Sequence, residues 1–347
     1  PGTLALVVHR LAADTASGHI LREDLTSAWQ DLAAGRRPGP APAGTSYRRW
    51  SRLLTEAAGE PARAGELALW RSVLSTDDPL LADRPLNPAT DVHGTARELE
   101  LLLPAETTGP LLERVPAAFN ATAEDVLLTG LALAVARWRR ERGLADGTAV
   151  LVGREGSGRE RLTEGTDVSR TVGWFSGAHP VAVDPGELPD DAWAGGPALG
   201  PVLKAVKEQL RAVPDNGIGY GMLRHLNPAT GRKLAGQAEP QVGFAYEDAP
   251  APAISGIPAD TPLRYALGLR AVAGEGPDGD RLLARWTWPD ALFTERDVRE
   301  LAELWFTALQ ALVTCAGRPE AGGLTPSDLS LLALSQDEID EFESDLS

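Results

Sequence analysis

Short apolar runs alternate along this chain with longer segments of helical periodicity, and this alternation restricts the fold more than any other feature. Short runs of apolar or alternating residues are typical of strands, whereas apolar residues three and four apart predict helices. The predicted strands are residues 3–9, 96–103, 149–152, 181–183, 240–246 and 281–288. The predicted helices are residues 20–32, 46–58, 61–74, 122–142, 202–213 and 295–315. Interleaved strands and helices without an internal repeat predict a layered α/β architecture.

Two segments rich in proline and glycine, residues 36–44 and 185–200, interrupt this pattern. Proline and glycine in such density predict loops or linkers. A third segment, residues 153–158, has spaced glycines but lacks the Lys-Ser/Thr pair and the following helix of a nucleotide-binding loop. We therefore expect no nucleotide and no cofactor in this chain.

Charge and residue usage exclude several classes of protein. The net charge of −16 argues against nucleic-acid binding, which needs clustered Lys and Arg, and favours basic partners. Cys315 is the only cysteine, so an intramolecular disulfide is impossible and a reducing cytoplasm is expected. The five histidines lack metal-ligand spacing, so no metal is expected.

The apolar stretch 126–138 contains Arg137, which predicts a buried helix and no membrane span. No signal peptide is recognised at the start.

Two polar segments carry the functional signal. Residues 9–15 (HRLAADT) form a loop between a predicted strand and a predicted helix, a common place for chemistry. Residues 155–160 (EGSGRE) follow another predicted strand. The first resembles the HHxxxDG motif of the condensation/epimerization domains of nonribosomal peptide synthetases, and the second resembles EGHGRE of the epimerization domains. Further blocks that resemble this family lie in the same order at residues 45–50, 66–70, 121–133, 170–175 (RTVGWF), 203–223 and 322–328.

The resemblance implies the fold. It predicts an α/β chain of two chloramphenicol-acetyltransferase-like lobes, arranged in a V around a tunnel. In the family, HHxxxDG lies well over a hundred residues into the domain, whereas here it begins at residue 9. We therefore expect an incomplete N-terminal lobe in this chain, with its remainder at residues 1–75 and the C-terminal lobe at residues 76–347.

The resemblance also implies where chemistry would occur. Epimerization removes and returns the α-proton of a peptidyl thioester, which requires a base and an acid on opposite faces. The family assigns these roles to the second His of HHxxxDG and to the Glu of EGHGRE, which are Arg10 and Glu155 here. A guanidinium stays protonated and only donates hydrogen bonds, so Arg10 cannot be the base. We expect Arg10 to pair with Glu155 or Asp14, since such a pair lowers a carboxylate's pKa and makes it a poor acid.

Three further departures from the family pattern surround the same site. Thr15 replaces the Gly of HHxxxDG, Ser157 replaces the His of EGHGRE, and Ala245 replaces the Asn of a Phe-Asn-Tyr segment. The resemblance implies that Asp14 is retained for structure, paired with a nearby Arg, and we expect His9 to be a packed core histidine. These residues together predict a degenerate active site and a chain that is not an enzyme.

An Arg in the second position of HHxxxDG resembles the X-domains of glycopeptide-antibiotic synthetases, although their pattern continues to Asp where this chain has Thr15. That resemblance implies recruitment of haem-thiolate (cytochrome P-450 type) oxygenases to a carrier-bound peptide for aromatic crosslinking. The implied neighbours are a peptidyl carrier protein and a thioesterase domain, and any haem belongs to the oxygenase. Two alternatives stay open: an epimerization domain with residual activity, and a silent structural spacer. Condensation activity is disfavoured because it also depends on the missing His.

Overall fold

The computed structural model of the chain describes residues 2–187, 189–250, 257–276, 279–329 and 334–345. A mixed six-stranded sheet lies at its centre, with the strand order β1-β6-β5-β4-β2-β3. The β2–β4 and β4–β5 pairs are parallel and the other pairs are antiparallel. The strands are β1 Ala96–Leu103, β2 Val150–Gly156, β3 Gly177–Val183, β4 Val242–Glu247, β5 Leu267–Gly276 and β6 Gly279–Pro289.

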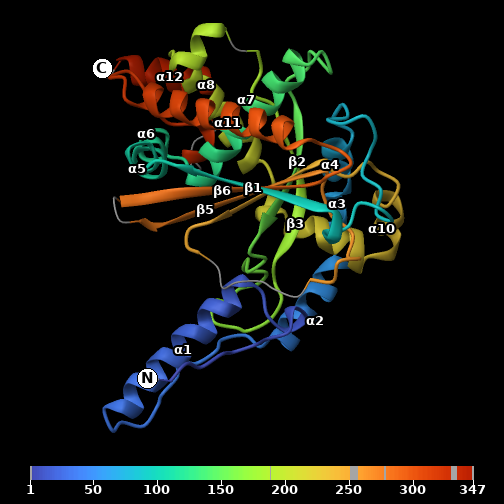
Figure 1. Ribbon diagram of the computed structural model, residues 1–347, viewed down its shortest axis with the longest axis vertical. Helices are drawn as coiled ribbons and strands as arrows, with labels where there is room; N and C mark the ends of the chain where they lie inside the picture. The colour runs from blue at the N-terminus through green and yellow to red at the C-terminus, as the bar shows by residue number, and fades with distance from the viewer. Residues whose placement is uncertain (1, 188, 251–256, 277–278, 330–333, 346–347) are drawn as a thin grey trace.

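Helices cover one face of this sheet, the first two helices of the chain project from the opposite side, and shorter helices lie beside its β3 edge (Figure 1). The N-terminal helices are α1 Thr15–Ala33, α2 Tyr47–Ala58, α3 Pro61–Gly65 and α4 Leu67–Leu74. The remaining helices are α5 Ala105–Gly109, α6 Val115–Phe119, α7 Ala123–Glu141, α8 Leu199–Arg211, α9 Ile218–Gly221, α10 Pro228–Leu234, α11 Glu295–Ala316 and α12 Gln336–Asp345. A π-helical turn, Met222–Leu226, connects α9 to α10.

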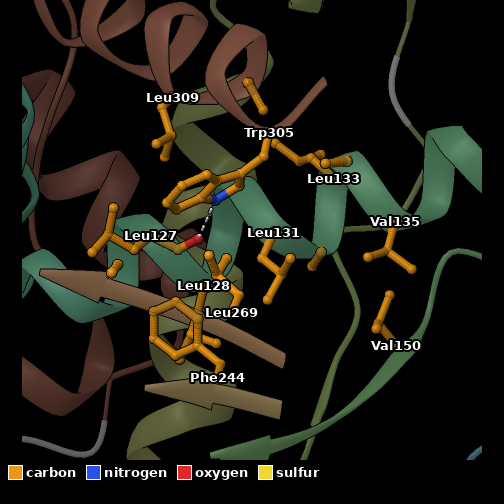
Figure 2. Close-up of a cluster of buried hydrophobic side chains, with 14 of the residues drawn as sticks. Leu127, Leu128, Leu131, Leu133, Val135, Val150, Phe244, Leu269, Trp305 and Leu309 are labelled. Atoms are coloured by element: carbon orange, nitrogen blue, oxygen red, sulfur yellow. Dashed lines mark hydrogen bonds between the residues drawn. The ribbon is translucent and has the colours of Figure 1, made fainter. Parts of the chain in front are cut away.

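The core lies between the sheet and the α7–α11 pair. Figure 2 shows Leu128 of α7 above Phe244 and Leu269 of the sheet, all three buried. On the other side of α7, Trp305 of α11 donates a hydrogen bond from Nε1 to the Leu127 carbonyl, at 3.1 Å. Gly130 allows this close approach, because a Cβ there would stand 2.6 Å from a Leu309 methyl.

The C-terminal segment after α11 is tied to the core by a buried ion pair. Lys207 of α8 is 1% exposed, and its Nζ lies 2.6 Å from Asp328 Oδ2 and 3.1 Å from the Phe119 carbonyl. Asn120 donates to the other oxygen of Asp328 at 2.7 Å. The hydrogen bonds to Lys207 compensate part of the cost of burying its charge.

The α/β architecture and most predicted elements are confirmed. The predicted long helix is α7, whose Thr122 and Asp125 form the expected capping box. Residues 3–9 are a wrong prediction: they are irregular and exposed, with Val7 93% exposed. No strand lies beside them in the described part of the chain, so their β propensity finds no partner. The sequence also missed β5, and the helix predicted over 61–74 is divided into α3 and α4.

No single helix among the described residues has the length and apolarity of a membrane span. The bent pair Ala105–Phe119 and Ala123–Glu141 meets those criteria by length and composition. The second of these helices is the buried α7 of the core.

Candidate functional site

Asp14 is the centre of a buried hydrogen-bond network that joins three distant sequence blocks. It is 6% exposed and caps α1, with Oδ1 accepting from Ser17 N at 2.8 Å. Its Oδ2 accepts from the Phe175 backbone N–H at 3.0 Å. Arg159 Nη2 lies 3.0 Å from Oδ1. The blocks 9–15, 155–160 and 170–175 therefore meet at one carboxylate.

The same hydrogen bonds determine the ionisation of Asp14. Burial by itself would raise the pKa of this carboxyl, but hydrogen bonds from Ser17 and Phe175 and the charge of Arg159 outweigh it. The pKa of Asp14 therefore lies below its usual value. Asp14 is therefore shielded and engaged by Ser17, Phe175 and Arg159, and Arg159 stands where the resemblance implied a nearby Arg.

Arg159 fixes the segment that returns towards α1. Its Nη1 donates to the carbonyls of Val168 at 2.6 Å and Thr171 at 2.9 Å. Its guanidinium lies 4.2 Å from the ring centroid of Phe175, a cation–π contact. Gly158 precedes it with φ +65, and a Cβ there would meet the Phe175 carbonyl oxygen at 1.8 Å. The resemblance implied an Arg partner for Asp14, and this partner is Arg159, which lies within the EGSGRE block and was not identified from the sequence.

Glu155 lies on the opposite face of the sheet from α7. Arg154 of β2 lies opposite Phe244 of β4 in the strand register, so the next residues, Glu155 and Ala245, also lie side by side. Ala245 in turn lies beside Arg270 of β5. Arg270 Nη2 reaches Glu155 Oε2 at 3.3 Å, and its Nη1 binds Glu247. Arg270 thus bridges two carboxylates over a strand position whose side chain is only a methyl group.

Several sequence predictions about this site need correction. The glycine-spaced loop predicted from residue 153 begins later, since β2 continues through Gly156 and places Glu155 on a strand. The expected pairing of Arg10 with Glu155 or Asp14 lies outside the described residues, and the cations found beside these carboxylates are Arg270 and Arg159. The backbone of Arg10 forms a short 3-10 turn, and its side chain lies outside the described part of the structure.

His9 is exposed, which contradicts the expectation of a packed core histidine. Its Nδ1 accepts from the Leu11 backbone N–H at 3.2 Å. It is exposed because residues 3–9, which would have buried it as a strand, lie unpaired on the surface. Thr15 begins α1 and is half-buried, whereas Ser157 is exposed and accepts from Arg159 N at 3.4 Å. Ala245 is buried, at 6% exposure.

Tyr265 also lies in this region, and it was not predicted from the sequence. A Cβ at Gly153 or Gly243 would stand 2.4 Å or 2.1 Å from its ring, so the ring lies against both glycines on the Glu155 face. Its hydroxyl is buried without a hydrogen-bond partner among the described residues. Burial raises the pKa of this phenol above its usual value. The signal that could have predicted such a ring is the pair of glycines on neighbouring strands.

A cavity of about 290 Å³ lies beside these groups, between α2 and the ends of β2 and β3. Trp50, Leu54 and Phe175 provide apolar walls, and Glu160 and His179 provide polar ones. Burial, with a smaller effect from Arg154, lowers the pKa of His179 to about 3. The imidazole is therefore neutral at physiological pH. Among the described residues, no cluster of three or more His, Cys, Asp or Glu could hold a metal ion.

Two features define a protein of the condensation and epimerization class. One is the sheet with helices on one face, and the other is the buried Asp–Arg link between the HHxxxDG-like and EGHGRE-like segments. The Condensation domain model matches residues 2–327, and the chain belongs to this family.

Curated relatives are peptide synthetases of several bacteria. One linear gramicidin synthase protein of Brevibacillus parabrevis is 33% identical over 357 residues, covering 98% of this chain and 6% of that protein. Chondramide synthase of Chondromyces crocatus is 35% identical over 358 residues, covering 98% of this chain and 8% of that protein. The chain thus spans less than a tenth of the length of these relatives.

Solved structures confirm the condensation-domain fold. The epimerization domain from the third module of tyrocidine synthetase B has a TM-score of 0.75 at 25% identity, covering 89% of this chain and 68% of that one. The X-domain from teicoplanin biosynthesis has a TM-score of 0.62 at 22% identity, with 90% and 69% covered. The complex of that X-domain with OxyB has a TM-score of 0.57 at 22% identity, with 94% and 69% covered.

Proposed function

We propose that this chain is a catalytically inactive condensation/epimerization-like domain of a nonribosomal peptide synthetase that recruits haem-thiolate oxygenases to a carrier-bound peptide. Its setting would be glycopeptide-antibiotic biosynthesis in the cytoplasm, next to peptidyl carrier and thioesterase domains. The observation that carries the proposal is the bridge from Arg270 to Glu155, at 3.3 Å.

The chemistry of proton transfer supports inactivity. An α-proton acceptor must stand free to approach the substrate carbon. Glu155 is instead paired with a guanidinium that also binds Glu247. The second His of the motif is replaced by Arg10, a side chain that cannot accept a proton. Neither of the two groups that the family would use is thus available.

Two observations support recruitment of an oxygenase. The fold is shared with an X-domain from teicoplanin biosynthesis and with the X-domain of its complex with OxyB. The net charge of −16 would attract a partner with a basic surface and raise the association rate.

Calorimetric titration of this chain with crosslinking oxygenases tests the proposal directly. We expect saturable binding that weakens as salt is raised. The tyrocidine epimerization domain is a fold-matched control and should not bind. Absence of binding at tens of micromolar, or equal binding to the control domain, would contradict recruitment.

An epimerization domain is the second candidate. The TM-score of 0.75 to the tyrocidine epimerization domain and the intact Asp14–Arg159 link favour it. Loss of deuterium from the α-carbon of a carrier-bound peptidyl thioester, followed by mass spectrometry, separates the two candidates. Exchange above background that disappears in Glu155→Gln would support the enzyme. Absence of both exchange and oxygenase binding would indicate a structural spacer.

A further inference from the structure

The cavity of about 290 Å³ between α2 and the ends of β2 and β3 has no part in the function proposed above. Gly156 and Gly158 line this cavity, whereas the described side chain of Glu155 does not. A cavity of about 150 Å³ already holds benzene. This one is therefore large enough for one aromatic ring with a substituent.

Aromatic side chains form the walls and the rim of this cavity. Trp50 and Phe175 are buried in its wall, with their ring centroids 6.0 Å apart. Tyr47 and Trp174 also line it and are 40% and 36% exposed, which places them at its rim. The Tyr47 hydroxyl donates to the Trp174 carbonyl at 2.9 Å. Exposed aromatic groups beside a hollow with apolar walls are typical of ligand sites, and such walls favour a planar ring.

Two polar side chains of the lining have buried atoms without a hydrogen-bond partner among the described residues. They are His179, which is 5% exposed and unpartnered at Nε2, and Glu160, which is unpartnered at Oε2. Buried polar atoms without partners are rare in folded proteins. His179 is neutral, so its Nε2 donates or accepts according to the tautomer, and a carboxyl oxygen of Glu160 can accept. A hydroxyl group, which both donates and accepts, can satisfy either atom.

The wall beside His179 has an unfavourable backbone conformation. Asp215 and Asn216 have φ 46 and 50, and Gly217 follows with φ +80. Asn216 and Gly217 line the cavity, and a Cβ at Gly217 would stand 2.1 Å from Cγ of the His179 ring. An ion pair from Arg63 to Asp215, at 2.8 Å, holds this turn in place. Strained backbone of this kind gathers at ligand sites, where the surrounding structure maintains it.

We propose that this cavity binds a phenolic ring, with its hydroxyl at His179 and Glu160 and its apolar part against Trp50 and Phe175. The apolar walls explain the ring, and the two unpartnered polar atoms explain the hydroxyl. The source of the phenol rests on the function proposed above, since a carrier-bound peptide with aromatic side chains would supply it. In that setting the domain would contact the peptide itself as well as the oxygenase.

Titration of the whole chain with p-cresol, toluene and benzylamine, followed by NMR, tests whether the cavity recognises a hydroxyl. We expect saturable binding of p-cresol and about fivefold weaker binding of toluene, because toluene leaves the polar atoms unpaired. The ¹⁵N resonance of His179 Nε2 should move with p-cresol, whereas those of the exposed His9 should not. Equal affinities for p-cresol and toluene, tighter binding of benzylamine, or an unchanged His179 resonance would overturn the proposal.

Three variants locate the ring. Ile218→Trp fills the cavity from its lining and should abolish binding of p-cresol. Leu144→Trp, at an exposed position outside that lining, should change the affinity by less than about twofold. His179→Phe keeps a ring in place and should remove the preference for p-cresol over toluene. Preserved binding in Ile218→Trp, or a preserved preference in His179→Phe, would overturn the proposal.

Urea unfolding checks that each variant folds, and the His179 resonance of the unmodified chain decides the matter if one does not. N-acetyltyrosinamide, which carries the same phenol on a peptide backbone, tests the source and should bind as p-cresol does. Binding of p-cresol alone would overturn the peptide as the source. Oxygenase titration separates the two proposals. A chain that binds phenols but no oxygenase keeps this site and contradicts recruitment, whereas a chain that binds an oxygenase but no phenol contradicts this site alone.

Discussion

Arg159 and Asp14 are 145 positions apart in the sequence, and their side chains meet with Nη2 3.0 Å from Oδ1. The link joins the N-cap of α1 to the segment after β2. Both groups are shielded, with side-chain exposures of 10% and 1%. Removal of either one leaves a buried charge without its partner.

Arg159→Ala should lower the free energy of unfolding by about 3–5 kcal/mol, because Asp14 would stay buried with its charge uncompensated. Urea unfolding followed by circular dichroism measures the change. Arg161→Ala, two positions away and exposed, should change stability by less than about 0.5 kcal/mol. A loss below about 1 kcal/mol in Arg159→Ala would show that the link is not structural.

Arg270→Ala should leave Glu155 and Glu247 close together on one sheet face without their shared cation. Because the groups are partly exposed, we expect a loss of about 1 kcal/mol at low salt that shrinks as salt is added. Adding Glu247→Gln should recover most of the loss. If the double variant is no more stable than Arg270→Ala, the two carboxylates do not repel each other as described.

His179 should make stability depend on pH in a defined window. Its pKa is lowered to about 3 in the fold, whereas an unfolded His titrates near its usual value, so the unfolded state binds the proton first. The stability that the fold gains from neutral His179 is complete above the pKa of this His in the unfolded chain. It is lost as pH falls through that value towards the lower pKa in the folded chain. At pH 5 the loss from this group is about 2 kcal/mol relative to pH 8.

His179→Gln removes that titration. The variant should show a shallower fall in unfolding free energy between pH 8 and pH 5 than the unmodified chain, measured by urea unfolding at each pH. His9→Gln is the matched control, since His9 is exposed. Identical pH profiles for the His179 variant and the unmodified chain would rule out this role.

Lys207→Met should destabilise the chain by about 3–5 kcal/mol, because Asp328 would keep its charge in a buried position. Lys207→Met/Asp328→Asn should regain part of the loss, since the second change removes that charge. Both variants are compared by urea unfolding. A double variant that is less stable than Lys207→Met would contradict an ion pair.

Long periodic elements could be predicted from the sequence, and the contacts of the site could not. The helix over 122–142 has both a capping box and a continuous apolar face, so local residues determine it. β5 was missed because Gly268, Gly274 and Gly276 weaken its strand signal, and it forms through pairing with β4 and β6. The family could be identified from the order of the motif blocks along the chain, because this order is kept even where single residues of a block are substituted.

The site residues illustrate the limit of such prediction. Arg10 was expected to pair with Glu155 or Asp14, since all three belong to motifs, and its side chain lies outside the described residues. The cation that the structure places beside Glu155 is Arg270, which lies in no motif. Only the strand register brings Arg270 beside Ala245. In the same way, residues 3–9 have the composition of a strand, and pairing with a neighbour, which the sequence does not show, decides whether one forms.

The tie from Asp328 to Lys207 has a mechanical consequence. A pull on the chain at Asp328 would load its contacts with Lys207 and Asn120, beside the Ser327–Glu208 hydrogen bond. The load would pass into α8 and the corner between α6 and α7, and α11 would be shielded from peeling. Tension on this segment would therefore reach the centre of the fold as shear, shared between the Lys207–Asp328 ion pair and the hydrogen bonds around it.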